Sequence, residues 1–283
     1  MDVRLETCVT CGRSMAGRYC ADCGEQAPHA HSYSLRHFIE DALENLIHLD
    51  GRVFRSFRAL LLAPGQLPCD FLRGRRKPYM GPVHMFLVAN LIYFILQPFS
   101  GFVPFTTPLD IQTRAFVWSG LANHMVSARL ESRSLNREDY RHRFNETAHL
   151  QGKTLVIIMV PLFALAAWAM YRRARPFFVE HLVFSFYAFA FLLIWIGMTA
   201  VLETRLIAVS VHHGYRPGGS LIELGSSAAT LVPFAVYLYL ASRRAYGQRA
   251  GLTLLKTASL AAWLIAVLMA YRMILFFTTF YAT

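Results

Sequence analysis

Long apolar stretches alternate with short charged segments along most of the chain. A helix that crosses the hydrocarbon core of a bilayer needs about 20 mostly apolar residues, with a range of roughly 17–25. The apolar stretches have this length, so the pattern predicts five transmembrane helices, the last of which is interrupted by Arg272. The predicted spans are residues 81–99, 154–171, 181–202, 221–241 and 257–281.

The composition agrees with a membrane protein. Of the 283 residues, 55% are hydrophobic and only 16% are charged, against roughly 25% charged residues in ordinary soluble domains. Together with a mean hydropathy of +0.37, this predicts an all-α integral membrane bundle of about five transmembrane helices. The predicted domains are a small head at 1–30, a basic amphipathic segment at 31–80 and the membrane domain at 81–283, with an outside loop at 101–153.

The distribution of Lys and Arg predicts the orientation in the membrane. Short connections on the cytoplasmic side carry an excess of these residues. Eleven of the 28 basic residues precede the first span, and the short link between the second and third spans contains Arg172, Arg173 and Arg175. The link between the fourth and fifth spans is also basic. We therefore expect a cytoplasmic N-terminus and a C-terminus on the outside.

The head carries two Cys-x-x-Cys-Gly motifs, formed by Cys8 with Cys11 and by Cys20 with Cys23. Two such turns supply four thiolates in a tetrahedron, which suits structural zinc. The head is too short for a hydrophobic core, so metal binding would supply its folding free energy. Two disulfides, or an iron site of the rubredoxin type, are the alternatives, and disulfides conflict with a cytoplasmic location. Cys69 stands apart from the motifs and is expected to be an ordinary small residue.

The charges of the head bear on its partner. Arg13 and Arg18 lie between the two motifs, but Asp22 and Glu25 accompany them, so the head has no concentrated basic patch. Nucleic-acid binding is therefore not favoured. We expect the head to contact a cytoplasmic protein or the inner loops of its own chain.

Residues 31–80 predict amphipathic helices on the membrane surface. One helix follows Ser34, with an apolar three–four repeat up to Ile47, and a second follows Gly51, with Arg at every third position beside Phe and Leu. Such helices suit the interface, and each nearby basic residue contributes about 1 kcal/mol at an anionic leaflet. The alternative is that these residues only set topology and pack on neighbouring helices. The residues assigned to anionic lipid are Arg52, Arg55, Arg58, Arg73, Arg75, Arg76 and Lys77.

Several motifs in order carry a family resemblance. They are the two cysteine motifs, Pro64-Gly65, Gly74-Arg-Arg-Lys-Pro-Tyr79, Pro161-Leu-Phe-Ala-Leu165 and Glu180-His-Leu-Val-Phe184. The chain in this respect resembles a bacterial membrane-protein family catalogued as domain-of-unknown-function family 3667. The resemblance implies a cytoplasmic zinc-ribbon-like head and a helical membrane domain, and hence a bacterial inner membrane. It implies no reaction and no catalytic residues.

Three polar residues near the spans form a speculative site: Glu180, His181 and Arg272. Charged groups within spans are functional candidates, although Arg272 at the end of a span would reach the head groups instead. Glu180 beside His181 could transfer protons. Adjacent helical residues do not face each other, however, so we expect each to have its own partner at the cytoplasmic rim.

The predicted outside loop offers one more candidate site. Glu138, His142, Glu146 and His149 would share one face of a helix over residues 130–150. Such a face could bind a divalent ion, but interleaved arginines favour an ordinary solvated helix.

The sequence contains no GxSxG, HExxH, GxxxxGK[ST] or GxGxxG motif, which lowers the expectation of an enzyme. We expect a non-enzymatic inner-membrane adaptor or regulatory protein, with a zinc head that contacts a protein and basic helices that contact anionic lipid. One alternative is a small transporter or lipid-handling protein that uses intramembrane polar residues, where a homodimer would complete an inverted repeat. The other is a membrane enzyme that uses Glu180 and His181.

Overall fold

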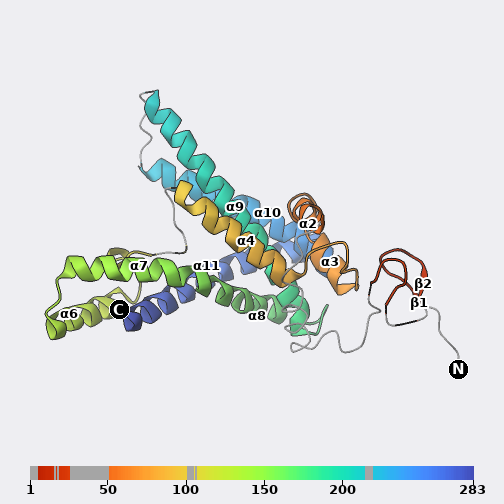
Figure 1. Cartoon of the computed structure of the whole chain (residues 1–283), viewed down its shortest axis with the longest axis horizontal. Coiled ribbons are helices and arrows are strands. Elements are labelled where there is room, and N and C mark those ends of the chain that lie inside the picture. Colours follow the sequence, from red (N-terminus) through yellow and green to blue (C-terminus); the bar gives the residue numbers. More distant parts are fainter. Residues whose placement is uncertain are drawn as a thin grey trace.

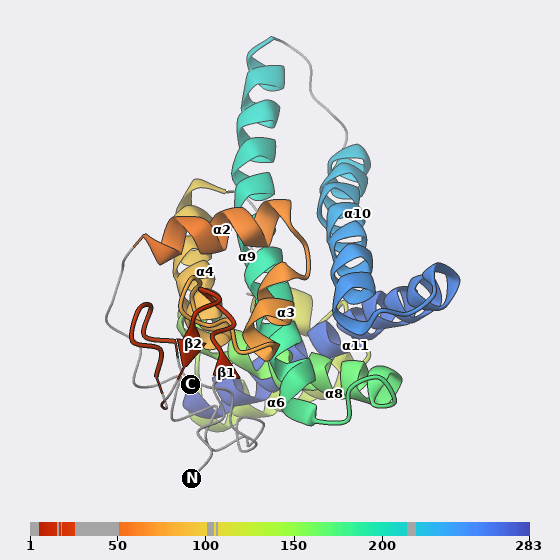
Figure 2. The ribbon, with the colours of Figure 1, turned by 90° about the vertical axis from the view of Figure 1, so that its right-hand side faces the viewer.

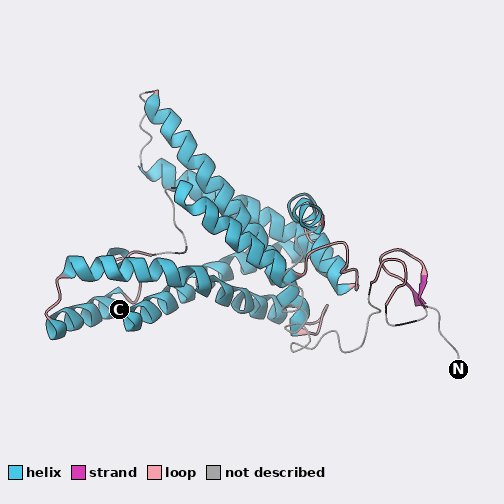
Figure 3. Cartoon of the chain, in the orientation of Figure 1, coloured by secondary structure: helices cyan, strands magenta, loops and turns pink. Residues whose placement is uncertain are grey.

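A computed structural model describes residues 6–15, 17, 19–25, 51–100, 105, 107–213 and 219–283. The predicted first amphipathic helix after Ser34 lies outside the described residues. The described chain is helical apart from two short strands in the head (Figure 3). In the head, β1 (Glu6–Thr7) pairs antiparallel with β2 (Ser14–Met15). The helices before and at the first span are α2 (Arg52–Leu62), α3 (Gln66–Leu72) and α4 (Pro82–Leu96), followed by η2 (Gln97–Phe99).

The remaining helices form a helical hairpin and the rest of the bundle. The hairpin comprises the short α5 (Leu109–Gln112), α6 (Ser119–Arg133) and α7 (Arg137–Leu155). The single turn η3 (Val156–Ile158) leads into α8 (Met159–Tyr171), and the three longest helices are α9 (Phe178–His212), α10 (Gly219–Tyr246) and α11 (Ala250–Ala282).

The number of spans agrees with the prediction of about five. Among the described residues, four stretches are long and apolar enough to cross a membrane: Pro82–Phe99, Phe178–His212, Gly225–Tyr246 and Ala250–Ala282. The count becomes five if the bent pair of α7 and α8 forms one span. The protein is therefore a multi-pass helical membrane protein.

The predicted second span differs from the others because α8 has only 13 residues. A helix of that length rises about 20 Å, short of the roughly 30 Å hydrocarbon core. It continues from α7 through η3 with a bend of 50°. Pro161, in the first turn of α8, explains the break, because a proline there has no N–H to donate to the preceding turn and cannot continue an earlier helix.

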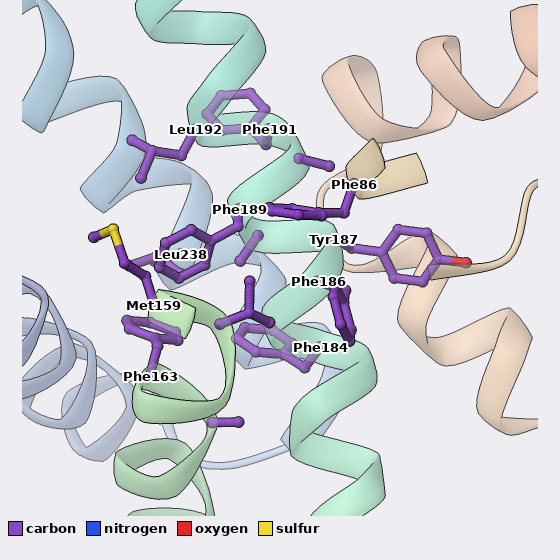
Figure 4. Close-up of a cluster of buried hydrophobic side chains, with 14 of the residues drawn as sticks. Phe86, Met159, Phe163, Phe184, Phe186, Tyr187, Phe189, Phe191, Leu192 and Leu238 are labelled. Atoms are coloured by element: carbon purple, nitrogen blue, oxygen red, sulfur yellow. The ribbon is translucent and has the colours of Figure 1, made fainter. Parts of the chain in front are cut away.

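The long helix α9 is the centre of the bundle. In the most apolar stretch of α9, 83% of the residues are buried, against 28–33% in the other three candidate spans. Aromatic side chains from α9 fill the core and meet those of the surrounding helices (Figure 4). The ring of Phe186 meets Phe86 of α4 edge-on at 5.6 Å, and Phe191 stacks on Tyr237 of α10 at 3.8 Å. Packing on α9 therefore orders the neighbouring helices.

The polar α6–α7 hairpin packs against the C-terminal part of α11, as Figure 1 shows. The predicted helix over residues 130–150 has the wrong bounds: Glu138, His142, Glu146 and His149 do share one helix, α7, but residues 130–133 belong to α6. The chain breaks after α6 at Ser134, whose φ is 49°, and α7 restarts after Asn136, whose Oδ1 accepts a hydrogen bond from Glu138 N–H at 2.9 Å. A left-handed residue followed by an Asn N-cap ends one helix and begins another.

The helix α2 lies across the end of the bundle. It is seen end-on in Figure 1 and lengthwise in Figure 2, where it crosses α4 and α9. Its inner face carries Ser56, Ala59 and Leu60, and Ser56 Oγ accepts a hydrogen bond from Met80 N–H at 2.8 Å. This placement suits a helix that lies flat on a membrane surface.

Gly65, directly before α3, packs closely against the backbone of α10, and this contact supports a stability prediction. Its φ is +77°, and a Cβ there would lie 2.8 Å from the carbonyl oxygen of Ala241. Gly247 has φ +62° with open space around it, so Gly247→Ala should cost only the left-handed strain of about 1–2 kcal/mol. We expect Gly65→Ala to cost clearly more in denaturant unfolding of the detergent-solubilised protein. Equal costs for the two variants would contradict the backbone clash.

Candidate metal centre and the juxtamembrane segment

The four predicted cysteine ligands converge in the head. The Sγ atoms of Cys8, Cys11, Cys20 and Cys23 lie within 4.8 Å of one another. Across the two motifs, Cys8 and Cys23 are 3.5 Å apart and Cys11 and Cys20 are 3.6 Å apart. Sulfur atoms placed 2.3 Å from a tetrahedral zinc ion are separated by about 3.8 Å, so the set fits a metal ion. A disulfide has sulfurs at about 2.05 Å, and all four cysteines are free thiols.

Both motifs fold into the same turn. The N–H of Gly12 donates to the carbonyl of Cys8 at 2.9 Å, and the N–H of Gly24 donates to the carbonyl of Cys20 at 2.8 Å. Both glycines have positive φ, at +77° and +67°, a conformation that glycine adopts without a steric penalty. The repeated geometry explains why each motif ends in glycine.

Backbone N–H groups point at the sulfur atoms. Those of Cys11 and Thr10 lower the pKa of Cys8 to about 7. For Cys23, the N–H of Glu25 lowers the pKa, but desolvation and the three neighbouring sulfurs raise it to about 12. Four thiols so close together resist full ionisation without a cation, whereas a metal ion binds the thiolate form. The donor set is therefore suited to a cation that replaces the thiol protons.

A buried carboxylate attaches the head to the segment before α4. Glu25 follows the second motif directly and is only 2% exposed. Its Oε2 accepts hydrogen bonds from the N–H groups of Lys77 at 2.9 Å and Arg76 at 3.1 Å, and from Thr10 Oγ1 at 2.7 Å. A Cβ on Gly24 would lie 3.2 Å from Lys77 Nζ. The second cysteine turn thus rests on the basic segment of its own chain.

The sequence prediction does not include Glu25 as a site residue. In that prediction its negative charge serves only as an argument that the head has no concentrated basic patch. A carboxylate directly after a metal-binding turn, in a chain with the basic stretch Arg73–Lys77, is a complementary signal. Nothing in the sequence identifies the backbone N–H groups of Arg76 and Lys77 as its partners.

The basic residues assigned to lipid gather at the end of the bundle that carries the head. Arg55 Nε donates to the carbonyl of Pro78 at 3.3 Å, and the Arg76 guanidinium lies 4.7 Å from the centre of the Phe71 ring. The exposed members are Arg55, Arg58, Arg73 and Lys77, and the partly buried members are Arg52, Arg75 and Arg76.

Glu180 and His181, at the start of α9, both contact Arg175, but through different groups of that residue. The Glu180 carboxylate accepts a hydrogen bond from Arg175 Nη1 at 2.7 Å. The ring nitrogens of His181 lie 2.9 Å from Tyr246 Oη and 3.0 Å from the carbonyl of Arg175. His181 has no exposed surface, so neither nitrogen is accessible to a substrate. The cluster joins the α8–α9 link to α10.

Arg272 is not brought together with Glu180 and His181. It lies on α11, 5.4 Å from the centre of the Phe116 ring, and its carbonyl accepts a hydrogen bond from Gln112 Nε2 at 3.3 Å. These neighbours lie in α5 and in the link that follows it, whereas Glu180 and His181 are at the first turn of α9. The three residues do not form one polar site.

The candidate residues on α7 do not gather into a metal site either. Glu138 pairs with Arg141, and its Oε1 lies 3.8 Å from His142 Nε2. Within the described residues, the four cysteines are the group of three or more His, Cys, Asp or Glu side chains that could hold a metal ion. The hairpin face is therefore a solvated face with local charge pairs.

Fold and site define the class as a multi-pass helical membrane protein with a four-cysteine head. Residues 50–94 match the model of the family described as "Protein of unknown function (DUF3667)", and this match supports the resemblance that the motifs indicate. The matched segment comprises α2, α3 and most of α4, and so includes the residues that receive Glu25. Searches of curated proteins and of solved structures found no match.

Proposed function

We propose that this protein is a non-enzymatic regulatory adaptor of the bacterial inner membrane, with its N-terminus in the cytoplasm and its C-terminus outside. Its head would hold a structural zinc ion through Cys8, Cys11, Cys20 and Cys23. The observation that carries the proposal is the buried Glu25 carboxylate, which connects the metal-binding turn to the basic juxtamembrane segment. Through this contact, the state of the head and the position of the basic segment are coupled.

The outer surface of the head supports a protein partner. Val9 lies within the first cysteine turn and Tyr19 directly precedes the second, and they are 45% and 59% exposed. Exposed apolar side chains on so small a module suit a protein contact. Closed four-sulfur coordination leaves no open metal position for catalysis, so the zinc ion would maintain the surface rather than act on a substrate.

The surface of α2 supports contact with anionic lipid. Phe54 and Leu62 are each 76% exposed, and Arg55 and Arg58 are exposed beside them. Apolar side chains among arginines on a helix that lies flat suit insertion into an anionic leaflet. The adaptor would thus contact lipid at the bundle end that carries the head.

Affinity purification in a gentle detergent tests the adaptor role. We expect a cytoplasmic protein to co-purify with the native chain and to be lost from the Cys8→Ser/Cys11→Ser variant at matched membrane levels. Cys69→Ser is the control, because Cys69 lies outside the head and should retain the partner. A second variant, Glu25→Ala, should keep its metal but change the amount of partner or of co-purified anionic lipid. A protein set identical in all four samples would refute the proposal.

A further inference from the structure

We define the α5–α6 loop as residues 111–121, which include the end of α5 and the first turn of α6. This loop lies where the helical hairpin meets the bundle. Gln112 Nε2 donates to the carbonyl of Arg272, and Gln112 Oε1 accepts a hydrogen bond from Trp118 Nε1 at 3.0 Å. From there α6 runs beside the last turns of α11, so that Arg129 reaches the carbonyl of Phe280. The loop is therefore at the near end of the hairpin, next to the bundle, and α6 leads away from it.

The charges of α11 mark the width of the membrane. Lys256 and Arg272 are separated by an apolar stretch that contains no other charge. Sixteen residues of helix rise about 24 Å, and both long side chains can extend toward the head groups, which together approach the roughly 30 Å of the hydrocarbon core. Lys256 Nζ donates to Met170 O at 2.7 Å near the bundle end that carries the head. Arg272, and with it the α5–α6 loop, therefore lies at the opposite membrane surface.

The α5–α6 loop has a polar side and an apolar side. Its polar side faces the protein, where Gln112 is fully buried and Trp118 donates a hydrogen bond to it. Its large aliphatic side chains face outward: Val117 is fully exposed at 103%, Leu121 is 54% exposed and Ile111 is 46% exposed. Exposed aliphatic residues with an amphipathic tryptophan and an arginine, here Arg114, are typical of the membrane interface.

We propose that the α5–α6 loop is an interfacial anchor that inserts Ile111, Val117 and Leu121 into the bilayer surface opposite the head. The occupant of this surface is phospholipid. The loop lies at the level where α11 leaves the membrane, and the exposed Arg114 complements phosphate groups. The anchor holds the hairpin against the membrane and fixes the tilt of the last turns of α11, which pack on that hairpin through Phe276.

Site-specific photo-crosslinking in the full-length protein tests the anchor. Benzoylphenylalanine replaces Val117 in one variant and Leu121 in a second, and all native cysteines are retained. The matched control places it at Ser132, which is exposed near the far end of α6. The proteins are irradiated in nanodiscs of phosphatidylethanolamine and phosphatidylglycerol, and intact-mass spectrometry detects adducts.

We expect a phospholipid adduct at positions 117 and 121 and no such adduct at position 132. No lipid adduct at either test position, in a variant that remains monodisperse on gel filtration, would overturn the proposal. A covalent dimer at position 117 would also overturn it, because the surface would then be an interface between copies of the chain.

Discussion

Replacing Cys8 by Ser is expected to remove the metal ion from the head and to unfold the head as a unit. The buried cluster of the head consists of Cys8, Met15 and Cys20, with Cys23 packed beside it. The core of the head is therefore formed largely by the candidate metal ligands. Structural zinc contributes roughly 10–16 kcal/mol to the folding of comparable peptides. Among the described residues of the head, no other contact approaches that value. Loss of one thiolate should therefore unfold the head and release Glu25 from the juxtamembrane segment.

Two measurements check this result. Elemental analysis of the purified protein should give one zinc per chain for the native protein and none for Cys8→Ser. Trypsin should cut at Arg13 much faster in the variant. Cys69→Ser is the matched control, because Cys69 is also buried but lies in the core of the helical bundle, where its Sγ donates to the carbonyl of Arg244 at 3.6 Å. Full metal content together with native protection in Cys8→Ser would contradict a four-sulfur site.

The pH dependence of metal retention follows from the same site. A thiol must lose its proton to bind a metal ion. Desolvation and the crowded sulfurs raise the pKa of Cys23 to about 12, whereas backbone N–H groups lower that of Cys8 to about 7. Protons compete with the metal for the sulfurs, so zinc is held less tightly as the pH falls. We therefore expect acidification to release the metal and to expose the head to trypsin, as the Cys8→Ser substitution does.

The apolar pattern was sufficient to predict four of the membrane helices, because a span must satisfy its backbone within itself and be apolar along about 20 residues. The predicted span at 154–171 reaches spanning length only together with α7. The lengths of α9 and α11 beyond the predicted spans were not predictable in this way. The helix α9 continues past the predicted end at residue 202 to His212, and α11 begins at Ala250 rather than at residue 257. Helix continuation outside the apolar stretch depends on tertiary packing, which the apolar pattern does not report. The break before Pro161 has a local cause that proline chemistry supplies, yet its bend of 50° follows from neighbouring helices.

The cysteine spacing was equally sufficient for the metal site, since ligand type and turn geometry are both written in adjacent residues. The contact between the head and the juxtamembrane segment was not predictable from the sequence in the same way. Glu25 bonds to residues about fifty positions away through their backbone N–H groups, which every non-proline residue possesses. The inward side of the α5–α6 loop is similar. Gln112 and Trp118 are unremarkable in the sequence, and only the fold places them beside Arg272.

Replacing Arg175 by Met is expected to destabilise the bundle by about 3–5 kcal/mol, the usual cost of breaking a buried ion pair. Arg175 donates to the carboxylate of Glu180, whose side chain is 6% exposed, at 2.7 Å. It also donates to the carbonyl of Ala245 at 3.2 Å. Without Arg175, the carboxylate of Glu180 remains buried with no cation beside it.

Reversible denaturant unfolding in detergent micelles measures this cost. Arg172→Met is the matched control: it removes one arginine from the same basic link, but Arg172 is exposed, so its substitution should stay within about 0.5 kcal/mol. The double variant Arg175→Met/Glu180→Leu should recover much of the loss, because replacing both members of a buried pair is often neutral. Recovery should be incomplete, since Glu180 also accepts a hydrogen bond from Phe177 N–H at 3.3 Å. If Arg175→Met and Arg172→Met were equally stable, the ion pair would not order the start of α9.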